Sequence, residues 1–103
     1  MPKFELESGK VFDSEHSKRQ WGEDRFHDGN NWISKATGQQ WLHERLHLTK
    51  GGAWVVEHWS QWQGSHPFVR EVTALDAARW LLLNDHDPIE AGISQEIVDK
   101  LQA

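Results

Sequence analysis

The sequence predicts a single α+β domain over residues 1–103, in which a small antiparallel sheet of four to six strands precedes two C-terminal helices. Three observations lead to this prediction. Two runs rich in strand formers flank Gly51-Gly52, good helix formers fill residues 74–84, and a second helical pattern follows Ser94. A chain of 103 residues is long enough to bury one modest core.

The N-terminal third predicts little regular structure. Residues 4–12 hold two short apolar pieces around a turn signal, which indicates a small edge hairpin. Residues 13–31 are polar apart from Trp21 and Phe26. We therefore expect a long polar loop or a mobile arm, which these two aromatic side chains pin to the body. Residues 32–62 then predict a three-strand meander, which begins with a short strand.

The stretch 40–64 is a predicted β-hairpin, and the sequence indicates its register. Before the double glycine, leucines alternate with polar residues, and after it β-branched and aromatic residues dominate. A three-residue loop at 50–52, with Gly52 in the left-handed conformation, sets Arg45 opposite Glu57. A two-residue turn would leave these charges without partners, so we predict the longer loop.

This register assigns each side chain of the hairpin to a face. The face expected to join the core carries Leu42, Leu46, Leu48, Trp54, Val56 and Trp62. The other face brings aromatic and polar side chains together, namely Trp41, His43, Trp59 and Gln61. Because tryptophan is enriched at binding hot spots, we expect these four residues to form a binding surface. Their neighbouring histidines are expected to be half-exposed.

An alternative hypothesis uses the same stretch, because His43-Glu44-Arg45-Leu46-His47 spells the H-E-x-x-H pattern and so resembles the zinc signature of zincin metalloproteases. On a helix, His43 and His47 share a zinc ion while Glu44 acts as the general base. On a strand, the two residues stand about 13 Å apart and cannot share an ion. The charge of Arg45 inside the motif and the helix stop at Gly51 favour the strand. A third ligand would come from Glu57, His58, His66 or Asp76.

The C-terminal third predicts one strand and two helices. Residues 68–72 form a strand after Pro67, a position that needs no backbone donor. Thr73 caps a helix at 74–84, which is expected to cover the leucine face of the hairpin. Ser94 caps a final helix with a short apolar stripe, so this helix must dock on another surface.

Composition excludes several functional classes. The chain contains no cysteine, which rules out disulfides, thiolate zinc sites and cysteine nucleophiles. A net charge of −5 opposes non-specific binding to nucleic acid, although an acidic protein can dock on a basic partner. No apolar run approaches the roughly 20 residues of a membrane span, and the first residues lack the apolar segment of a signal peptide. We therefore expect a soluble cytoplasmic protein with no membrane contact.

Two motifs carry a resemblance to other proteins. They are Trp59-Ser60-Gln61-Trp62-Gln63-Gly64 and Ala77-Ala78-Arg79-Trp80-Leu81. In this respect the chain resembles a group of small bacterial proteins in which a tryptophan-rich hairpin precedes a short helix. The likeness covers roughly the middle half of the chain. It implies the hairpin rather than the zincin helix, and it implies no activity.

The leading functional hypothesis is a non-catalytic binding module without a cofactor. A protein partner, or a second copy of the chain, is the first ligand class to consider. A carbohydrate is the next, because flat tryptophans beside glutamine and histidine suit sugar stacking. A zinc-dependent hydrolase is the enzymatic alternative. If the last helix packed on the face that carries Trp41 and Trp59, these rings would be core and the predicted site would be lost.

Overall fold

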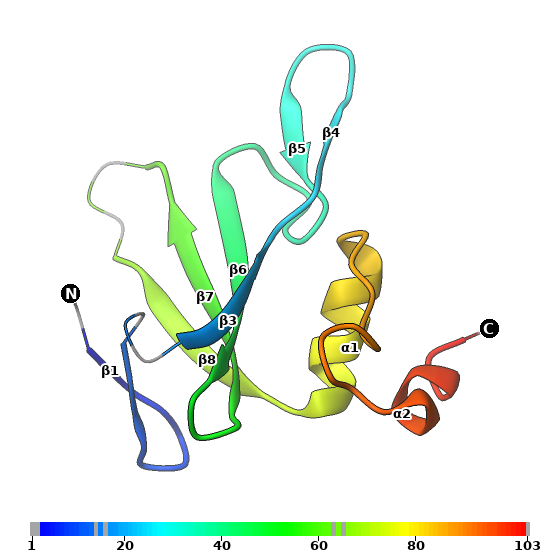
Figure 1. Cartoon of the computed structure of the whole chain (residues 1–103). Coiled ribbons are helices and arrows are strands. Elements are labelled where there is room, and N and C mark those ends of the chain that lie inside the picture. Colours follow the sequence, from blue (N-terminus) through cyan, green and yellow to red (C-terminus); the bar gives the residue numbers. More distant parts are fainter. Residues whose placement is uncertain (1–2, 14, 16, 63, 65, 103) are drawn as a thin grey trace.

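The computed structural model describes residues 3–13, 15, 17–62, 64 and 66–102 of the chain (Figure 1). The described residues form, in chain order, β1 (Phe4–Glu5), β2 (Val11–Phe12), β3 (Ser17–Gly22), β4 (Arg25–His27), β5 (Trp32–Ser34), β6 (Leu42–Thr49), β7 (Trp54–Ser60), β8 (Phe68–Val72), α1 (Ala74–Leu83) and α2 (Gln95–Asp99). One antiparallel sheet has the strand order β3-β6-β7-β8, and β1–β2 and β4–β5 form two separate hairpins. The predicted α+β class, with two C-terminal helices after the sheet, is confirmed.

The β6–β7 hairpin has the predicted register. Arg45 lies opposite Glu57, and the pairs before and after it follow in step. The Thr49 amide donates to the Ala53 carbonyl oxygen at 2.9 Å, which closes a three-residue loop. Gly52 has φ +85° there, a conformation that glycine adopts without the steric cost of a side chain.

The prediction of a long polar loop at 13–31 is wrong for most of its length, while positions 14 and 16 lie outside the described residues. β3 pairs with β6 as an outer strand of the sheet, and β4 also falls within this stretch. The sequence of β3 looks polar because Trp21 is the one large apolar residue among the side chains that this strand directs toward the core. That ring is buried and packs against Trp54, with 5.6 Å between ring centroids.

The predicted three-strand meander over 32–62 is also wrong, because β5 pairs with β4 rather than with β6. The turn between β4 and β5 is stabilised by the Asp28 carboxylate, which accepts hydrogen bonds from the backbone amides of Asn30 and Asn31, each at 2.8 Å. The resulting hairpin extends beyond the sheet (Figure 1). Phe26 and Trp32 on it remain exposed, so only Trp21 of the two expected anchors holds this stretch to the body.

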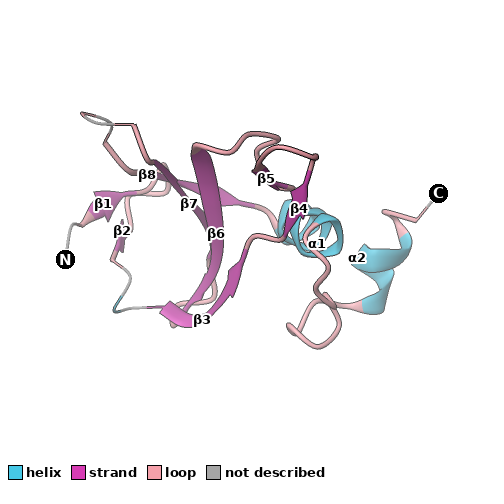
Figure 2. Ribbon diagram, turned by 90° about the horizontal axis from the view of Figure 1, so that it is seen from above, coloured by secondary structure: helices cyan, strands magenta, loops and turns pink. Residues whose placement is uncertain are grey.

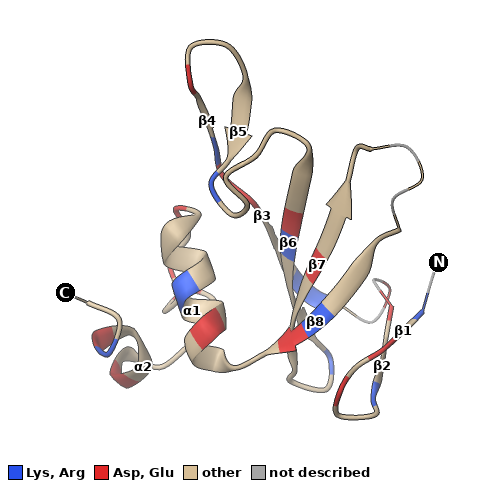
Figure 3. Cartoon of the chain, turned by 180° about the vertical axis from the view of Figure 1, so that it is seen from behind, with Lys and Arg blue, Asp and Glu red and all other residues tan. Residues whose placement is uncertain are grey.

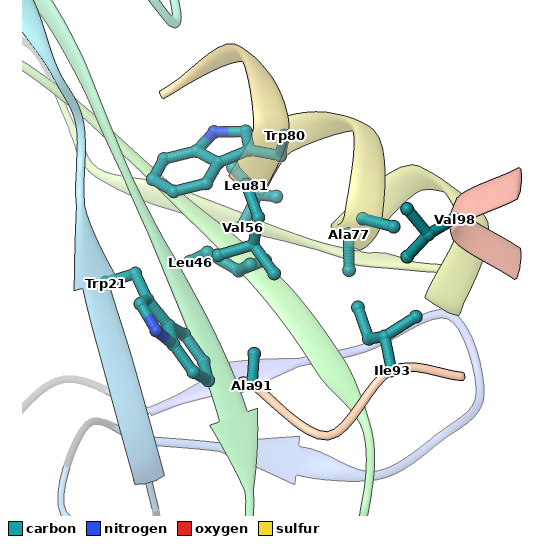
Figure 4. Packing of buried hydrophobic residues seen from close by; sticks show 10 residues of the cluster. Trp21, Leu46, Val56, Ala77, Trp80, Leu81, Ala91, Ile93 and Val98 are labelled. Carbon is teal, nitrogen blue, oxygen red and sulfur yellow. The ribbon is translucent and has the colours of Figure 1, made fainter. Parts of the chain in front are cut away.

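The molecule has three layers (Figures 1 and 2). The four-strand sheet lies between the β1–β2 hairpin on one side and the helices on the other. The main core joins β3, β6 and β7 to α1, α2 and the segment between the helices (Figure 4). Its buried residues are Trp21, Leu46, Val56, Ala77, Ala78, Trp80, Leu81, Ala91, Ile93 and Val98. The prediction that the first helix covers the leucine face of the hairpin is confirmed.

Both helices begin at the predicted caps. The Thr73 hydroxyl accepts a hydrogen bond from the Asp76 amide at 3.1 Å, and Ser94 caps α2 in the same way. Val98 of α2 packs into the main core beside α1, so the last helix does not cover the opposite face of the sheet. In the part of the chain that the structure describes, no helix has the length and apolar character needed to cross a membrane.

The opposite face of the sheet is covered at one end by the β1–β2 hairpin. Leu6 and Phe12 pack on Val55 to form a second, smaller core. His47 is fully buried beside it, with its ring centroid 5.0 Å from that of Phe12. The expectation of half-exposed histidines on this face is therefore wrong for His47 and also for His43, which is only 8% exposed. At His47 it failed because the covering residues come from a hairpin more than thirty positions earlier in the sequence.

Candidate functional site

Two clefts open at the end of β6 and β7 that the cores leave uncovered. The larger, which we call the aromatic cleft, has a volume of about 640 Å³, and its lining includes Leu42, Glu44, His58, Trp62 and Phe68. The smaller, which we call the arginine cleft, has a volume of about 330 Å³, and its lining includes Glu23, Arg25, His43, Arg45, Trp59 and Gln61. Neighbouring residues on a strand point to opposite faces, so Glu44 and His43 direct their side chains to different sides of β6.

Large apolar side chains are exposed around the aromatic cleft. Trp62 is 60% exposed and Phe68 is 58% exposed, and Leu42 is also exposed. Trp41 lies beside the cleft with its ring centroid 5.4 Å from that of Trp62. The prediction that Leu42 and Trp62 belong to the core is wrong, because the buried cluster beneath α1 reaches only as far along β6 as Leu46.

A hydrogen-bonded network around Glu44 closes the main core below this cleft. The Trp80 indole donates to one carboxylate oxygen of Glu44 at 2.9 Å, and Nδ1 of His58 lies 3.0 Å from the other. The His58 ring also stacks on Phe68, with centroids 4.4 Å apart. Burial alone raises the pKa of the Glu44 carboxyl, but the hydrogen bonds from His58 and Trp80 outweigh burial and hold this pKa below its usual value.

We expect Glu44→Gln to lower the free energy of unfolding by about 2 kcal/mol at pH 7, because it weakens two charge-assisted hydrogen bonds. Since folding lowers the pKa of Glu44, its ionised form stabilises the fold above the usual value of 4.5. That stabilisation is lost as the pH falls through the lower folded-state pKa. Urea denaturation at pH 7 and pH 3 should therefore show the variant's deficit shrinking in acid. Glu96→Gln, an exposed control, should change little at either pH. An equal deficit for Glu44→Gln at both pH values would contradict this account.

The arginine cleft contains a buried carboxylate–imidazole pair. Glu23 accepts hydrogen bonds from the Ser34 hydroxyl, from Nδ1 of His43 and, at 3.1 Å, from the Glu44 amide. The side chains of Glu23 and His43 are only 9% and 10% exposed. Within the described residues, Nε2 of His43 is buried and has no hydrogen-bond partner. The pair therefore leaves one buried ring nitrogen without a partner.

Trp59 and Arg45 form the outer part of the same cleft. The Trp59 ring stacks on His43 with 5.6 Å between centroids, because these residues are direct cross-strand partners. The Arg45 guanidinium carbon lies 5.1 Å from the centroid of the Trp59 ring, a cation–π contact. The backbone amide of Gln61 donates to the Trp41 carbonyl oxygen at 3.0 Å, which extends the β6–β7 pairing to the cleft.

The helical zinc hypothesis is wrong, because the H-E-x-x-H stretch lies on β6. His43 pairs with Glu23, whereas His47 has its own partners, Ser17 Oγ at 3.0 Å and Glu57 Oε1 at 2.9 Å. The Glu44 carboxylate is held by Trp80 and His58 on the opposite face of the sheet, so it is not placed to act as a general base toward a water bound on the face of the two imidazoles. Among the residues that the structure describes, no group of three His, Asp or Glu side chains is arranged to hold a metal ion.

Three of the four residues predicted to form the binding surface lie together. His43, Trp59 and Gln61 line the arginine cleft, whereas Trp41 packs on Trp62 beside the aromatic cleft. The sequence reasoning missed Glu23, which follows β3, and Phe68, which begins β8, and both contribute to the clefts from distant parts of the chain. Only the pairing of β3 with β6 and of β8 with β7 brings them there, and the hairpin alone gives no signal for either.

Comparison of the chain with protein-family models, with curated proteins and with solved structures gives no match.

Proposed function

We propose that the protein is a non-catalytic binding module, which holds an apolar segment of a protein partner in the aromatic cleft. The observation that carries this proposal is the gathering of exposed large side chains around one hollow, namely Trp41, Leu42, Trp62 and Phe68. Exposed apolar residues that cluster in this way are typical of interaction sites, whereas single exposed residues are ordinary. Trp41 contributes by packing on Trp62 and limiting the positions of its ring.

The chemistry of the cleft favours a protein segment over a carbohydrate. Leu42 adds an aliphatic wall to the aromatic rings, and aromatic and aliphatic anchors together are typical of protein interfaces. Sugar recognition needs free polar groups beside the rings to bind hydroxyls. The Glu44 carboxylate is already engaged by Trp80 and His58, so it is not free for that role.

The test is a selection of peptides from a random displayed library, followed by affinity measurements on variants. We expect the selected peptides to share an aromatic or branched aliphatic anchor. Trp62→Ala should weaken their binding about tenfold, because it removes a large contact surface at the centre of the cleft. The matched control is Trp32→Ala on the β4–β5 hairpin, since Trp32 is 61% exposed and Trp62 is 60% exposed.

Trp32→Ala should bind the selected peptides as the wild-type protein does. The proposal fails if no peptide is enriched over background, or if the two tryptophan variants weaken binding equally. Circular dichroism of both variants should match the wild-type spectrum, because each substitution removes an exposed side chain.

A further inference from the structure

The arginine cleft differs chemically from the aromatic cleft, since most of the polar groups that line it are hydrogen-bond donors. We infer that it is a binding site for an oxyanion, a carboxylate or a phosphate group carried by a ligand. The two clefts share His43, Glu44 and Trp59, but this inference rests on Arg25 and Arg45, which, of the two, line only the arginine cleft, and does not depend on the proposed peptide site. In Figure 3, β4 and β6 both carry basic positions, and Arg25 and Arg45 from these strands line the cleft.

The two guanidinium groups have donors to spare. Arg45 lies 4.0 Å from the Glu57 carboxylate, beyond hydrogen-bond distance, and Glu57 is already bonded to His47. The Arg25 side chain makes no hydrogen bond or ion pair within the described part of the chain. Guanidinium groups match the geometry of carboxylates and phosphates through paired N–H donors. The side-chain amide of Gln61 adds a neutral donor.

The carboxylates at this cleft do not oppose an incoming anion strongly. Glu23 lines the cleft, but its oxygens are occupied by Ser34, His43 and the Glu44 amide. The Glu44 side chain points to the other face, where it is bonded to Trp80 and His58. Each of these carboxylates is therefore compensated by its own hydrogen-bond donors, and the positive charges of Arg25 and Arg45 can bind the negative charge of a ligand.

His43 contributes to the wall of the cleft and is held in place from behind. Its Nδ1 is hydrogen-bonded to Glu23, and its side chain is nine-tenths buried. Its Nε2 is buried and unpartnered among the described residues, which is a costly arrangement for a polar atom. The ring nitrogens of His43 are therefore sensitive reporters of any ligand that binds beside the two arginines.

The experiment is an NMR titration of the wild-type protein with inorganic phosphate and, separately, with acetate, at constant ionic strength. We expect saturable shifts at the backbone amides of Arg25, Arg45 and Gln61 and at the ring nitrogens of His43, all with one dissociation constant in the millimolar range, about 1–10 mM. Phosphate bound at least tenfold more tightly than acetate would identify a phosphate-bearing ligand. Acetate bound more tightly than phosphate would identify a carboxylate, and equal affinities would identify a site that accepts either oxyanion.

The double variant Arg25→Gln with Arg45→Gln should weaken binding of the better anion at least tenfold, because each substitution removes a charge-assisted donor. The control is Arg79→Gln with Lys100→Gln, which removes the same charge from the helices and should leave the affinity unchanged. Shifts that rise linearly without saturation, or equal losses in the two double variants, would overturn the inference. The peptide assay depends on Trp62, which lines only the aromatic cleft, and the anion titration depends on Arg25 and Arg45, which, of the two clefts, line only the arginine cleft. Either conclusion can therefore fail while the other stands.

Discussion

Leu46→Ala is expected to lower the free energy of unfolding by about 3 kcal/mol and the melting temperature by about 15 °C. Leu46 is fully buried in the main core, in the centre of the β6 strand. Truncating it removes apolar contacts with Trp21, Val56 and α1 and leaves a cavity that surrounding side chains fill only in part. Chemical denaturation at pH 7 measures the difference.

Leu83→Ala provides the matched control, because the same side chain is removed from a position that is 62% exposed. We expect its effect to stay within about 0.5 kcal/mol. A cost below about 1 kcal/mol for Leu46→Ala would mean that this leucine is not at the centre of the core, and it would contradict the strand assignment of the whole stretch.

Glu23→Ala should lower the free energy of unfolding by a similar amount, about 3 kcal/mol at pH 7. Its carboxylate joins β3 to β5 and β6 through the Ser34 hydroxyl, the His43 ring and the Glu44 amide. Removing it leaves these mostly buried donors without their acceptor, and an unsatisfied buried donor costs more than a bond to solvent. Denaturation curves for the variant and the wild-type protein give the difference directly.

Two further variants separate this explanation from a general loss of charge. Glu7→Ala, on the exposed turn between β1 and β2, should change the stability by no more than about 0.5 kcal/mol. Glu23→Gln keeps an oxygen acceptor and should recover part of the loss. If Glu23→Ala proves as mild as the Glu7 variant, the buried pair contributes nothing to stability and is not a structural element of the cleft.

The parts of the fold that follow from local chemistry were predictable from the sequence. The register of the β6–β7 hairpin depends on Gly52 in the left-handed conformation and on the pairing of Arg45 with Glu57, all within a few residues of the loop. The helix caps at Thr73 and Ser94 are local in the same way. β3 was missed because it pairs with a strand that is distant in the sequence. Its residues are polar apart from one inward tryptophan, so they show no apolar alternation that would indicate a strand.

The candidate site was predictable only in part, for the same reason. The cross-strand pair His43 and Trp59 follows from the hairpin register and was predicted together with Gln61. Glu23, which is hydrogen-bonded to the His43 ring, lies in a segment predicted to be a loop. The register within β6 and β7 was predicted correctly, but Trp41 and Trp62, predicted on opposite faces, pack on each other beyond the ends of these strands. How far each face is covered depends on α1 and on the β1–β2 hairpin.

The arrangement of the sheet also has a consequence for how the chain folds. The β6–β7 hairpin closes a loop of three residues, whereas β3 reaches β6 only after residues 23–44 have been closed off as one excursion. The entropy lost on loop closure grows with loop length, so we expect the short hairpin to form first and β3 to join it later. Arg19 ties β3 to Glu90, beyond the end of α1, through two hydrogen bonds to the carboxylate at 2.8 and 3.0 Å and one to the carbonyl oxygen at 3.0 Å. We therefore expect β3 to be held fully in place only after the segment between the two helices has packed beside it.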